Sequence, residues 1–100
     1  MKNKIKTFED YKNTELTESE RRVLELKSEL ICNLIDARLS AGETQVSLGK
    51  KTQIQQPMLA RIENEISDPK VTTLIKLLDG IGKKIIIVDQ DAAAQSKIAE

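Results

Sequence analysis

Residues 44–64, with the sequence TQVSLGKKTQIQQPMLARIEN, constrain the fold of this chain more than any other stretch. Thr44 suits a helix N-cap because its hydroxyl can accept a backbone N–H that the first turn leaves free. A short helix is therefore predicted from there to about residue 51. Residues 52–54 predict a tight turn, and residues 55–65 predict a second short helix. The pattern is typical of a helix-turn-helix, which the rest of the chain must support.

A long helix is predicted before this unit. Thr17 and Glu20 match a capping box, in which each side chain binds the backbone N–H of the other residue. Gly42 suits the left-handed residue that follows a helix end, so the helix should run to about Ser40. Cys32 is expected to be a buried, inert thiol on this helix. The apolar residues recur at helical spacing and predict one buried stripe, formed by Val23, Leu26, Leu30, Ile31, Leu34, Ile35, Ala37 and Leu39.

Another helix is predicted after the unit. Ser67 or Asp68 is the expected N-cap, with Pro69 in the first turn, where its missing N–H costs nothing. Gly82 is expected to end this helix. Its predicted apolar face consists of Val71, Leu74, Ile75, Leu77, Leu78 and Ile81.

Residues 84–88, with the sequence KIIIV, predict a strand because they are rich in β-branched side chains and lie between Gly82 and Asp89. No mate for this strand is evident within the chain, and an unpaired apolar edge needs a cover. We expect the same strand of a second copy to pair with it and form a homodimer. Residues 4–8 or a partner protein are the alternatives. The predicted dimer strand consists of Ile85, Ile86, Ile87 and Val88.

The composition limits the fold class further. The chain has 100 residues, of which 32% are charged and 2% aromatic, so a single core must be built from Leu, Ile and Val. The predicted fold is all-α, a small helical bundle with a helix-turn-helix, plus one short C-terminal β-strand used in dimerisation. We divide the chain into an N-terminal arm (residues 1–16), a helix-turn-helix domain that ends with the strand (residues 17–88) and a polar tail (residues 89–100).

The residue types present exclude several classes of function. With one Cys and no His, zinc sites and histidine-based catalysis are excluded. No spaced acid pair, Gly-rich phosphate loop or metal-ligand cluster suggests an enzyme, a cofactor or a metal. No apolar run approaches a membrane span and no signal peptide is evident, so we expect a cytoplasmic protein. The net charge is zero, and residues 43–84 carry seven Lys and Arg against five Asp and Glu. This charge permits nucleic-acid binding without indicating it.

The outward face of the second short helix (residues 55–65) predicts a surface that reads DNA. Leu59 and Ile62 are expected to face inward, which turns small, polar and singly basic side chains outward. Gln56 can form a pair of hydrogen bonds with adenine, and Arg61 can form a pair with guanine. A helix that needed only to be soluble would more often carry Glu and Lys there.

Other contacts to DNA are expected around this face. Gln45 begins the preceding helix, where side chains and free N–H groups meet a phosphate. Lys50 and Lys51 could neutralise backbone charge, but they fit ordinary surface lysines equally well. Pro57 and Ala60 allow close approach and can touch a thymine methyl group. The predicted DNA-binding residues are Gln45, Gln55, Gln56, Pro57, Met58, Ala60, Arg61 and Asn64.

Residues 34–88 resemble the Cro/phage-repressor-like (XRE) helix-turn-helix family. The resemblance implies sequence-specific binding to double-stranded operator DNA. It also implies an ion pair between Arg38 and Glu63 that ties the first helix to the reading helix. The matching residues are Thr44, Gln45, Leu48, Ile54, Gln55, Gln56, Arg61, Ile62, Glu63 and Asn64, followed by Ser67, Asp68, Pro69, Ile81 and Gly82.

The chain departs from the family pattern at two positions. Gln53 stands in the turn where Gly is usual, so it is expected to accept a positive φ at a cost on the order of 1 kcal/mol. Glu65 stands where a Gly usually follows the Glu-Asn pair, so the reading helix is expected to run a residue or two longer. Neither departure changes the predicted motif.

The two ends of the chain resemble those of HigA-type antitoxins. The matching features are an arm and a long helix before the motif, and residues 81–88, IGKKIIIV, after it. The resemblance implies that the protein binds and blocks a HigB-type RNase toxin and represses its own operon. The toxin contact is expected at Phe8, Tyr11, Val23 and Leu24. In the alternative interpretation, the two aromatic residues fold back on the core.

Two other functions stay open. One is a stand-alone XRE-type transcriptional repressor without a toxin partner. The other is an interaction module whose helix-turn-helix does not meet DNA, which the zero net charge favours. Salt-dependent binding to operator DNA separates this module from the other two functions.

Overall fold

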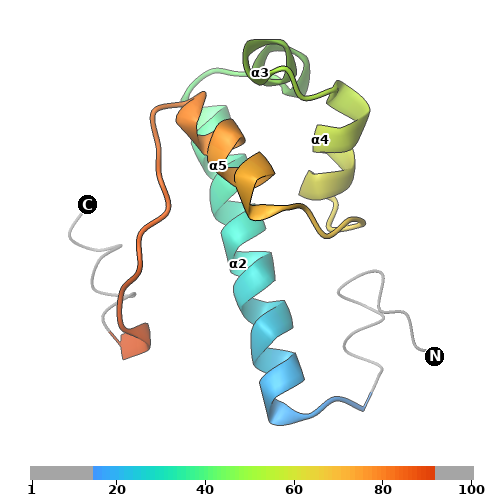
Figure 1. Ribbon diagram of the computed structural model, residues 1–100, viewed down its shortest axis with the longest axis vertical. Coiled ribbons are helices and arrows are strands. Elements are labelled where there is room, and N and C mark those ends of the chain that lie inside the picture. The colour runs from blue at the N-terminus through green and yellow to red at the C-terminus, as the bar shows by residue number, and fades with distance from the viewer. Residues whose placement is uncertain (1–14, 92–100) are drawn as a thin grey trace.

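The computed structural model describes residues 15–91, which form helices packed around one small core (Figure 1). The predicted all-α bundle with a helix-turn-helix is confirmed. None of the helices in this part of the chain is both long and apolar enough to cross a membrane. Phe8 and Tyr11, where part of the toxin contact was predicted, lie outside the described residues. The helices are α2 (Glu18–Ser40), α3 (Gln45–Thr52), α4 (Gln56–Glu63) and α5 (Val71–Asp79).

Helix α2 begins at a capping box, as predicted. Thr17 Oγ1 accepts the Glu20 N–H at 3.0 Å, and Glu20 Oε1 accepts the Thr17 N–H at 3.0 Å. The helix ends at Ser40, and Gly42 follows with a φ of 76°. The C-terminal half of α2 lies against the other helices, while its N-terminal half projects beyond them (Figure 1).

The core joins Leu and Ile side chains from all four helices and from the turn between α3 and α4. The apolar residues are spread over these elements, so each short helix contributes only one to three of them. The buried residues are Ile31, Leu34, Leu48, Ile54, Leu59, Ile62, Leu74, Leu77 and Leu78.

The predicted buried stripe on α2 is only partly correct. Val23 and Leu26 are 61% and 47% exposed, because α3, α4 and α5 cover only the other half of the helix. Leu39 is 60% exposed as well. Cys32 is exposed and not buried as predicted, because a rotation of about 100° per residue turns it away from the core side that Ile31 occupies.

Helices α3 and α4 join through a turn that requires one left-handed residue and one close backbone contact. Gln53 has a φ of 63°, as predicted. The Ile54 N–H donates to the Gly49 carbonyl at 2.9 Å. A Cβ atom on Gly49 would lie 2.5 Å from the Ile54 carbonyl oxygen. The turn therefore depends on Gly49, a residue that the sequence pattern did not single out.

Helix α4 ends sooner than predicted. Its last residue is Glu63 and Asn64 is the C-cap. Glu65 then takes a φ of 58° instead of extending the helix. A glutamate thus occupies a backbone conformation that glycine usually fills at a helix end.

Helix α5 begins later than predicted. Val71 is its first residue, and Lys70 is an N-cap without a side-chain hydrogen bond. Ser67 and Asp68, the predicted caps, lie before Lys70 and do not cap the helix. Lys27 Nζ of α2 lies 3.0 Å from the Ser67 carbonyl oxygen and 3.5 Å from Asp68 Oδ1. The intervening proline therefore precedes the helix and does not lie in its first turn.

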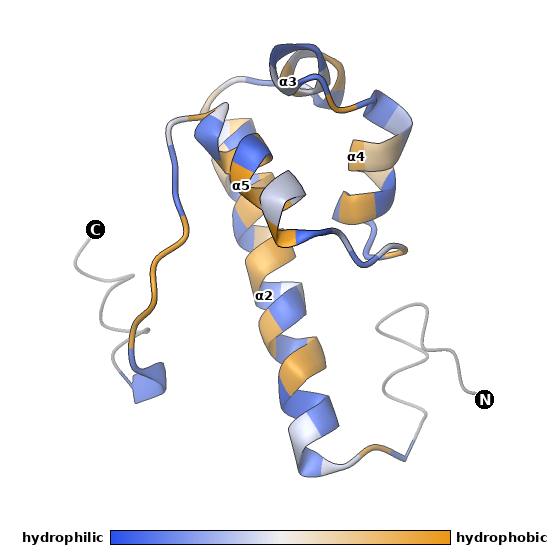
Figure 2. Ribbon diagram, viewed as in Figure 1, coloured by the Kyte–Doolittle hydropathy of each residue, from blue (hydrophilic) through white to orange (hydrophobic). Residues whose placement is uncertain are grey.

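The predicted strand is not confirmed, because residues 83–89 form no strand in the described part of the chain. The segment leaves α5 and runs beside α2 (Figure 1), and its apolar residues stand out in Figure 2. Ile85 and Ile86 border a groove with Leu30 and Leu34 of α2, whereas Ile87 is 98% exposed. A strand requires a neighbour that supplies backbone hydrogen bonds, and none lies beside this segment among residues 15–91.

Gly49→Ala is expected to destabilise the protein by about 1–3 kcal/mol, because the added Cβ overlaps a backbone oxygen that cannot move freely. The free energy of unfolding is measured by urea denaturation. Lys50→Ala, at the exposed neighbouring position, is the control and should change stability by no more than about 0.5 kcal/mol. In an unconstrained helix, alanine stabilises relative to glycine. A more stable Gly49→Ala protein would therefore contradict the close contact.

Candidate nucleic-acid interface

Helix α4 has one buried face and one exposed face. Leu59 and Ile62 are 0% and 1% exposed and belong to the core, as predicted. The structure places the predicted reading residues of this helix on the side away from the core. Gln55, Pro57, Met58, Arg61 and Asn64 are exposed, and Gln56 and Ala60 are partly buried.

A buried ion pair joins the end of α4 to α2. Arg38 Nε lies 2.7 Å from Glu63 Oε2, and Arg38 Nη2 lies 2.9 Å from Glu63 Oε1. The two side chains are only 10% and 6% exposed. Arg38 Nη1 also donates to the Glu43 carbonyl at 2.9 Å. Bidentate, charge-assisted hydrogen bonds have a fixed geometry. The pair therefore sets the position of α4 relative to α2 and to the start of α3.

Two glutamines extend this ion pair to the surface. Gln45 Nε2 donates to Glu63 Oε1 at 2.8 Å, and Gln56 Nε2 donates to Gln45 Oε1 at 2.7 Å. Because a carboxylate can only accept, the Gln45 amide must turn its NH₂ group toward Glu63 and its oxygen toward Gln56. Gln56 therefore keeps its carbonyl oxygen and its second N–H for a ligand. The carboxylate in the interior thus determines which groups the outer glutamine presents.

The first turn of α3 is held by a second set of side chains. Thr44 and Ser47 cap each other's backbone N–H groups at 2.9 Å. The Glu43 carboxylate accepts from Lys51 Nζ at 2.6 Å and from Ser47 Oγ at 2.5 Å. The Lys51 bond, followed by the Ser47 bond, holds the pKa of Glu43 below its ordinary value of 4.5. Lys51 is thus already engaged, while Lys50 is exposed and forms no ion pair with another described residue.

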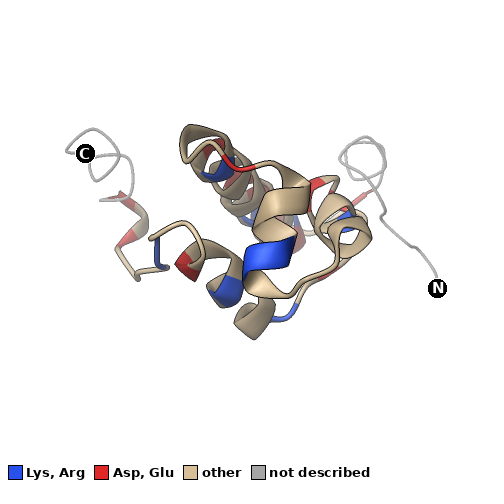
Figure 3. Ribbon diagram, turned by 90° about the horizontal axis from the view of Figure 1, so that it is seen from above, with Lys and Arg blue, Asp and Glu red and all other residues tan. Residues whose placement is uncertain are grey.

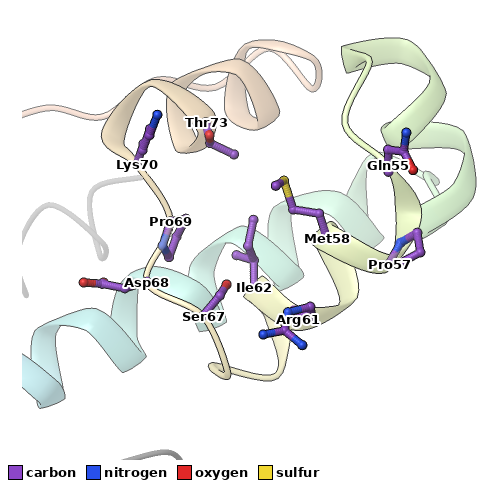
Figure 4. A pocket seen from close by; sticks show the side chains of 10 residues that line it. All are labelled: Gln55, Pro57, Met58, Arg61, Ile62, Ser67, Asp68, Pro69, Lys70 and Thr73. Carbon is purple, nitrogen blue, oxygen red and sulfur yellow. The ribbon is translucent and has the colours of Figure 1, made fainter.

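A groove lies beside Arg61, between α4 and the segment that leads to α5 (Figure 4). Apolar side chains make up much of its wall, and Arg61 and Lys70 are its basic residues. Ser67 Oγ is buried beside it and has no hydrogen-bond partner within residues 15–91. The groove is lined by Gln55, Pro57, Met58, Arg61, Ile62, Ser67, Asp68, Pro69, Lys70 and Thr73.

The charges do not form a basic patch in the described part of the chain. Seen from the α3 end of the molecule, Lys and Arg are interspersed with Asp and Glu (Figure 3). A single copy therefore offers little long-range attraction to a polyanion. The main feature of this surface is its hydrogen-bonding groups and not the electrostatic field of its charges.

The remaining predicted site residues lie apart from α4. Val23 and Leu24 are on the projecting half of α2, where Val23 is exposed and Leu24 is partly buried. The segment that contains Ile85, Ile86, Ile87 and Val88 runs along α2 on the side away from α4 (Figure 1). The structure therefore does not bring these residues into one site with the reading helix.

Sequence reasoning missed two features of this surface. The Ser47 side chain caps the Thr44 N–H, and the three-residue spacing of these two residues could have predicted this contact. The contact from Gln45 to both Gln56 and Glu63 had no such signal, because it depends on how the turn brings α3 and α4 together.

Comparisons with known proteins agree with this geometry. A family model described as "Helix-turn-helix" matches residues 34–87, which span the C-terminal part of α2 and all of α3, α4 and α5. The chain belongs to this helix-turn-helix family. A Haemophilus influenzae protein named "Uncharacterized HTH-type transcriptional regulator" is 36% identical over 81 residues, which cover 81% of this chain and 83% of that protein. No solved structure matches the chain significantly. The resemblance to the family is confirmed, and the narrower resemblance to HigA-type antitoxins stays a prediction.

Glu63→Gln is expected to destabilise the fold by about 3–5 kcal/mol, because it leaves the Arg38 guanidinium buried without a counter-charge. Urea denaturation of this variant, of Arg38→Gln and of the double variant gives a double-mutant cycle. The double variant should lose clearly less stability than the sum of the two single variants. Additive losses would show that the two side chains do not stabilise each other.

Proposed function

We propose that this protein is a sequence-specific DNA-binding transcriptional regulator that inserts α4 into the major groove of double-stranded operator DNA. The observation that carries the proposal is the connected set of hydrogen bonds from Arg38 through Glu63 and Gln45 to Gln56. These bonds fix the orientation of the Gln56 amide, so that its carbonyl oxygen and one N–H stay available to a ligand. Membership of the helix-turn-helix family supports the same function.

The groups left free on Gln56 match one base. Its carbonyl oxygen accepts from adenine N6 and its second N–H donates to adenine N7. Arg61, which is exposed on the next turn, donates to guanine O6 and N7. Pro57 and Ala60 are short and allow the helix to approach the base edges. The protein would thus read a site in which an adenine and a guanine lie a few base pairs apart.

Contacts to the DNA backbone would come from both sides of this helix. The second N–H of Gln45 would donate to a phosphate of one strand, in line with its place at the start of α3. The groove beside Arg61 would accommodate a segment of the other DNA strand, with Lys70 near a phosphate and the apolar walls near a sugar. Lys50 adds a free positive charge. These contacts set the register without carrying sequence information.

Dimerisation would compensate for the weak charge of one copy. Two copies related by a twofold axis would place their reading helices roughly 34 Å apart, one turn of DNA, and read a near-palindrome. The apolar segment 85–88 supports this, since Ile86 is 61% and Ile87 98% exposed in the single chain. Pairing with the same segment of a second copy would supply the missing strand partner.

The more specific function that we propose is that of an antitoxin, which blocks a HigB-type RNase toxin and represses its own operon. Support comes from the projecting half of α2, whose exposed Val23 and Leu26 lie away from the reading face. A partner could bind there while α4 holds DNA. Val23 and Leu24, together with Phe8 and Tyr11, are the proposed toxin contacts. A stand-alone repressor without a toxin fits the same reading face equally well.

Co-purification distinguishes the antitoxin from the stand-alone repressor. The chain is co-expressed with the product of the adjacent reading frame, and the experiment is repeated with a chain that starts at residue 17. Stable capture by the full chain and weaker capture by the short chain are expected. Full retention by the short chain would remove the arm from the contact, and no capture by either would favour the stand-alone repressor.

Arg61→Ala should lose about 1–3 kcal/mol of operator-binding free energy and relax the preference for one base. Binding sites are first selected from random duplex DNA, and variants are then compared by fluorescence anisotropy. Arg22→Ala removes the same charge on the projecting half of α2 and is the control. It should leave the base preference unchanged. An Arg61→Ala protein with unaltered base preference would contradict the assignment of this residue.

Ile87→Lys should convert a dimer of this protein into a monomer, because it places a charge on the proposed pairing strand. The side chain is 98% exposed in the single chain, so the fold itself should keep its stability. Light scattering over a range of concentrations gives the mass of each protein. A wild-type chain that stays monomeric at every concentration would contradict dimerisation through this segment.

A further inference from the structure

The second residue after α4 is a glutamate in a conformation that glycine adopts after α2 and α5. Helices α2, α4 and α5 end in the same way, with one left-handed residue just after the helix. These residues are Gly42, Glu65 and Gly82, with φ values of 76°, 58° and 74°. A side chain at such a position is strained, and glycine is not. An interaction of the Glu65 side chain would offset this strain.

The left-handed residue allows the chain after α4 to form backbone hydrogen bonds with the last turn of the helix, which includes Arg61. The Ile66 N–H donates to the Arg61 carbonyl at 2.9 Å, and the Glu65 N–H donates to the Ile62 carbonyl at 3.0 Å. This pair of bonds is the Schellman motif, which forms only while the residue after the C-cap stays left-handed. The backbone of Arg61, which we propose reads guanine, is thus fixed by the conformation of Glu65.

The compensating interaction comes from α2. Ser28 Oγ lies 2.8 Å and 2.9 Å from the two carboxylate oxygens of Glu65 and shares its hydroxyl proton between them. On the adjacent residue, Lys27 Nζ donates to the Ser67 carbonyl at 3.0 Å and lies 3.5 Å from Asp68 Oδ1. The chain after α4 is therefore held on two sides of Ile66. Glycine at position 65 would give the same backbone without the bond to Ser28.

We propose that Ser28 is a positioning residue for DNA reading, which holds Glu65 left-handed and so fixes the last turn of α4. This inference rests on the proposed function and adds one residue of α2 to it. Ser28 does not lie on the reading face of α4. Its effect reaches DNA through Glu65 and the backbone of Arg61.

The test compares Ser28→Ala, Glu65→Gly, their double variant and Glu65→Gln in operator binding and thermal unfolding. Glu65→Gly removes the bond to Ser28 but keeps residue 65 left-handed without strain, so it should keep both the melting temperature and the operator affinity. Ser28→Ala leaves Glu65 without this contact and should lose affinity roughly tenfold. The double variant should regain that affinity, because glycine needs no such contact. Glu65→Gln keeps an acceptor for Ser28 and should retain most of the affinity. Ser19→Ala, an exposed serine on the same helix, should bind as the wild type does.

Hydrogen exchange without DNA separates this inference from the proposed function. The Ile66 amide should exchange faster in Ser28→Ala than in the wild type, and stay slow in Glu65→Gly. Unchanged Ile66 exchange or wild-type operator affinity in Ser28→Ala, or a double variant that binds as weakly as Ser28→Ala, would each overturn the positioning role. A wild-type protein that binds no selected DNA would overturn the proposed function, and the exchange rates would still decide whether α2 holds Glu65.

Discussion

The contact between Arg38 and Glu63 is the interaction on which the rest of this structure depends. One guanidinium group holds both oxygens of the carboxylate and the Glu43 carbonyl, so it fixes α2, α4 and the start of α3 together. A hydrophobic pair of similar size could fill this space without loss of stability. Such a hydrophobic pair could not accept the hydrogen bond from Gln45, which fixes the orientation of the Gln56 amide. We infer that the pair is used for positioning more than for stability.

The surface that we propose reads DNA and the surfaces that we propose bind protein partners lie apart on the molecule. Helices α3, α4 and α5 pack on the C-terminal half of α2 and carry the hydrogen-bonding face, while the other half of α2 and segment 83–89 carry exposed apolar side chains (Figures 1 and 2). With zero net charge, long-range attraction contributes little, so in the proposed function specific contacts and a second copy would supply the affinity for DNA. Separate surfaces would allow the proposed protein partner to bind while α4 holds DNA.

Local chemistry made part of this structure predictable from the sequence. The capping box at Thr17 and the positive φ of Gln53 follow from residue type and spacing within a few positions. The errors occurred where distant parts of the chain decide the outcome. Val23 and Leu26 were expected to be buried, but the apolar pattern does not say which half of α2 the other helices cover. Ser67 was expected to cap α5, and Glu65 to extend α4, because nothing nearby indicates that α2 holds both of them.

The central claim is that the buried carboxylate orients Gln56 to read adenine. It is tested most directly with operator DNA in which single adenines are replaced by 7-deazaadenine, which lacks the N7 acceptor and keeps the N6 donor. The account predicts one position in each half-site where this replacement weakens binding of the wild-type protein roughly fivefold or more and has no effect on Gln56→Ala. Equal sensitivity of the two proteins at every adenine would contradict it.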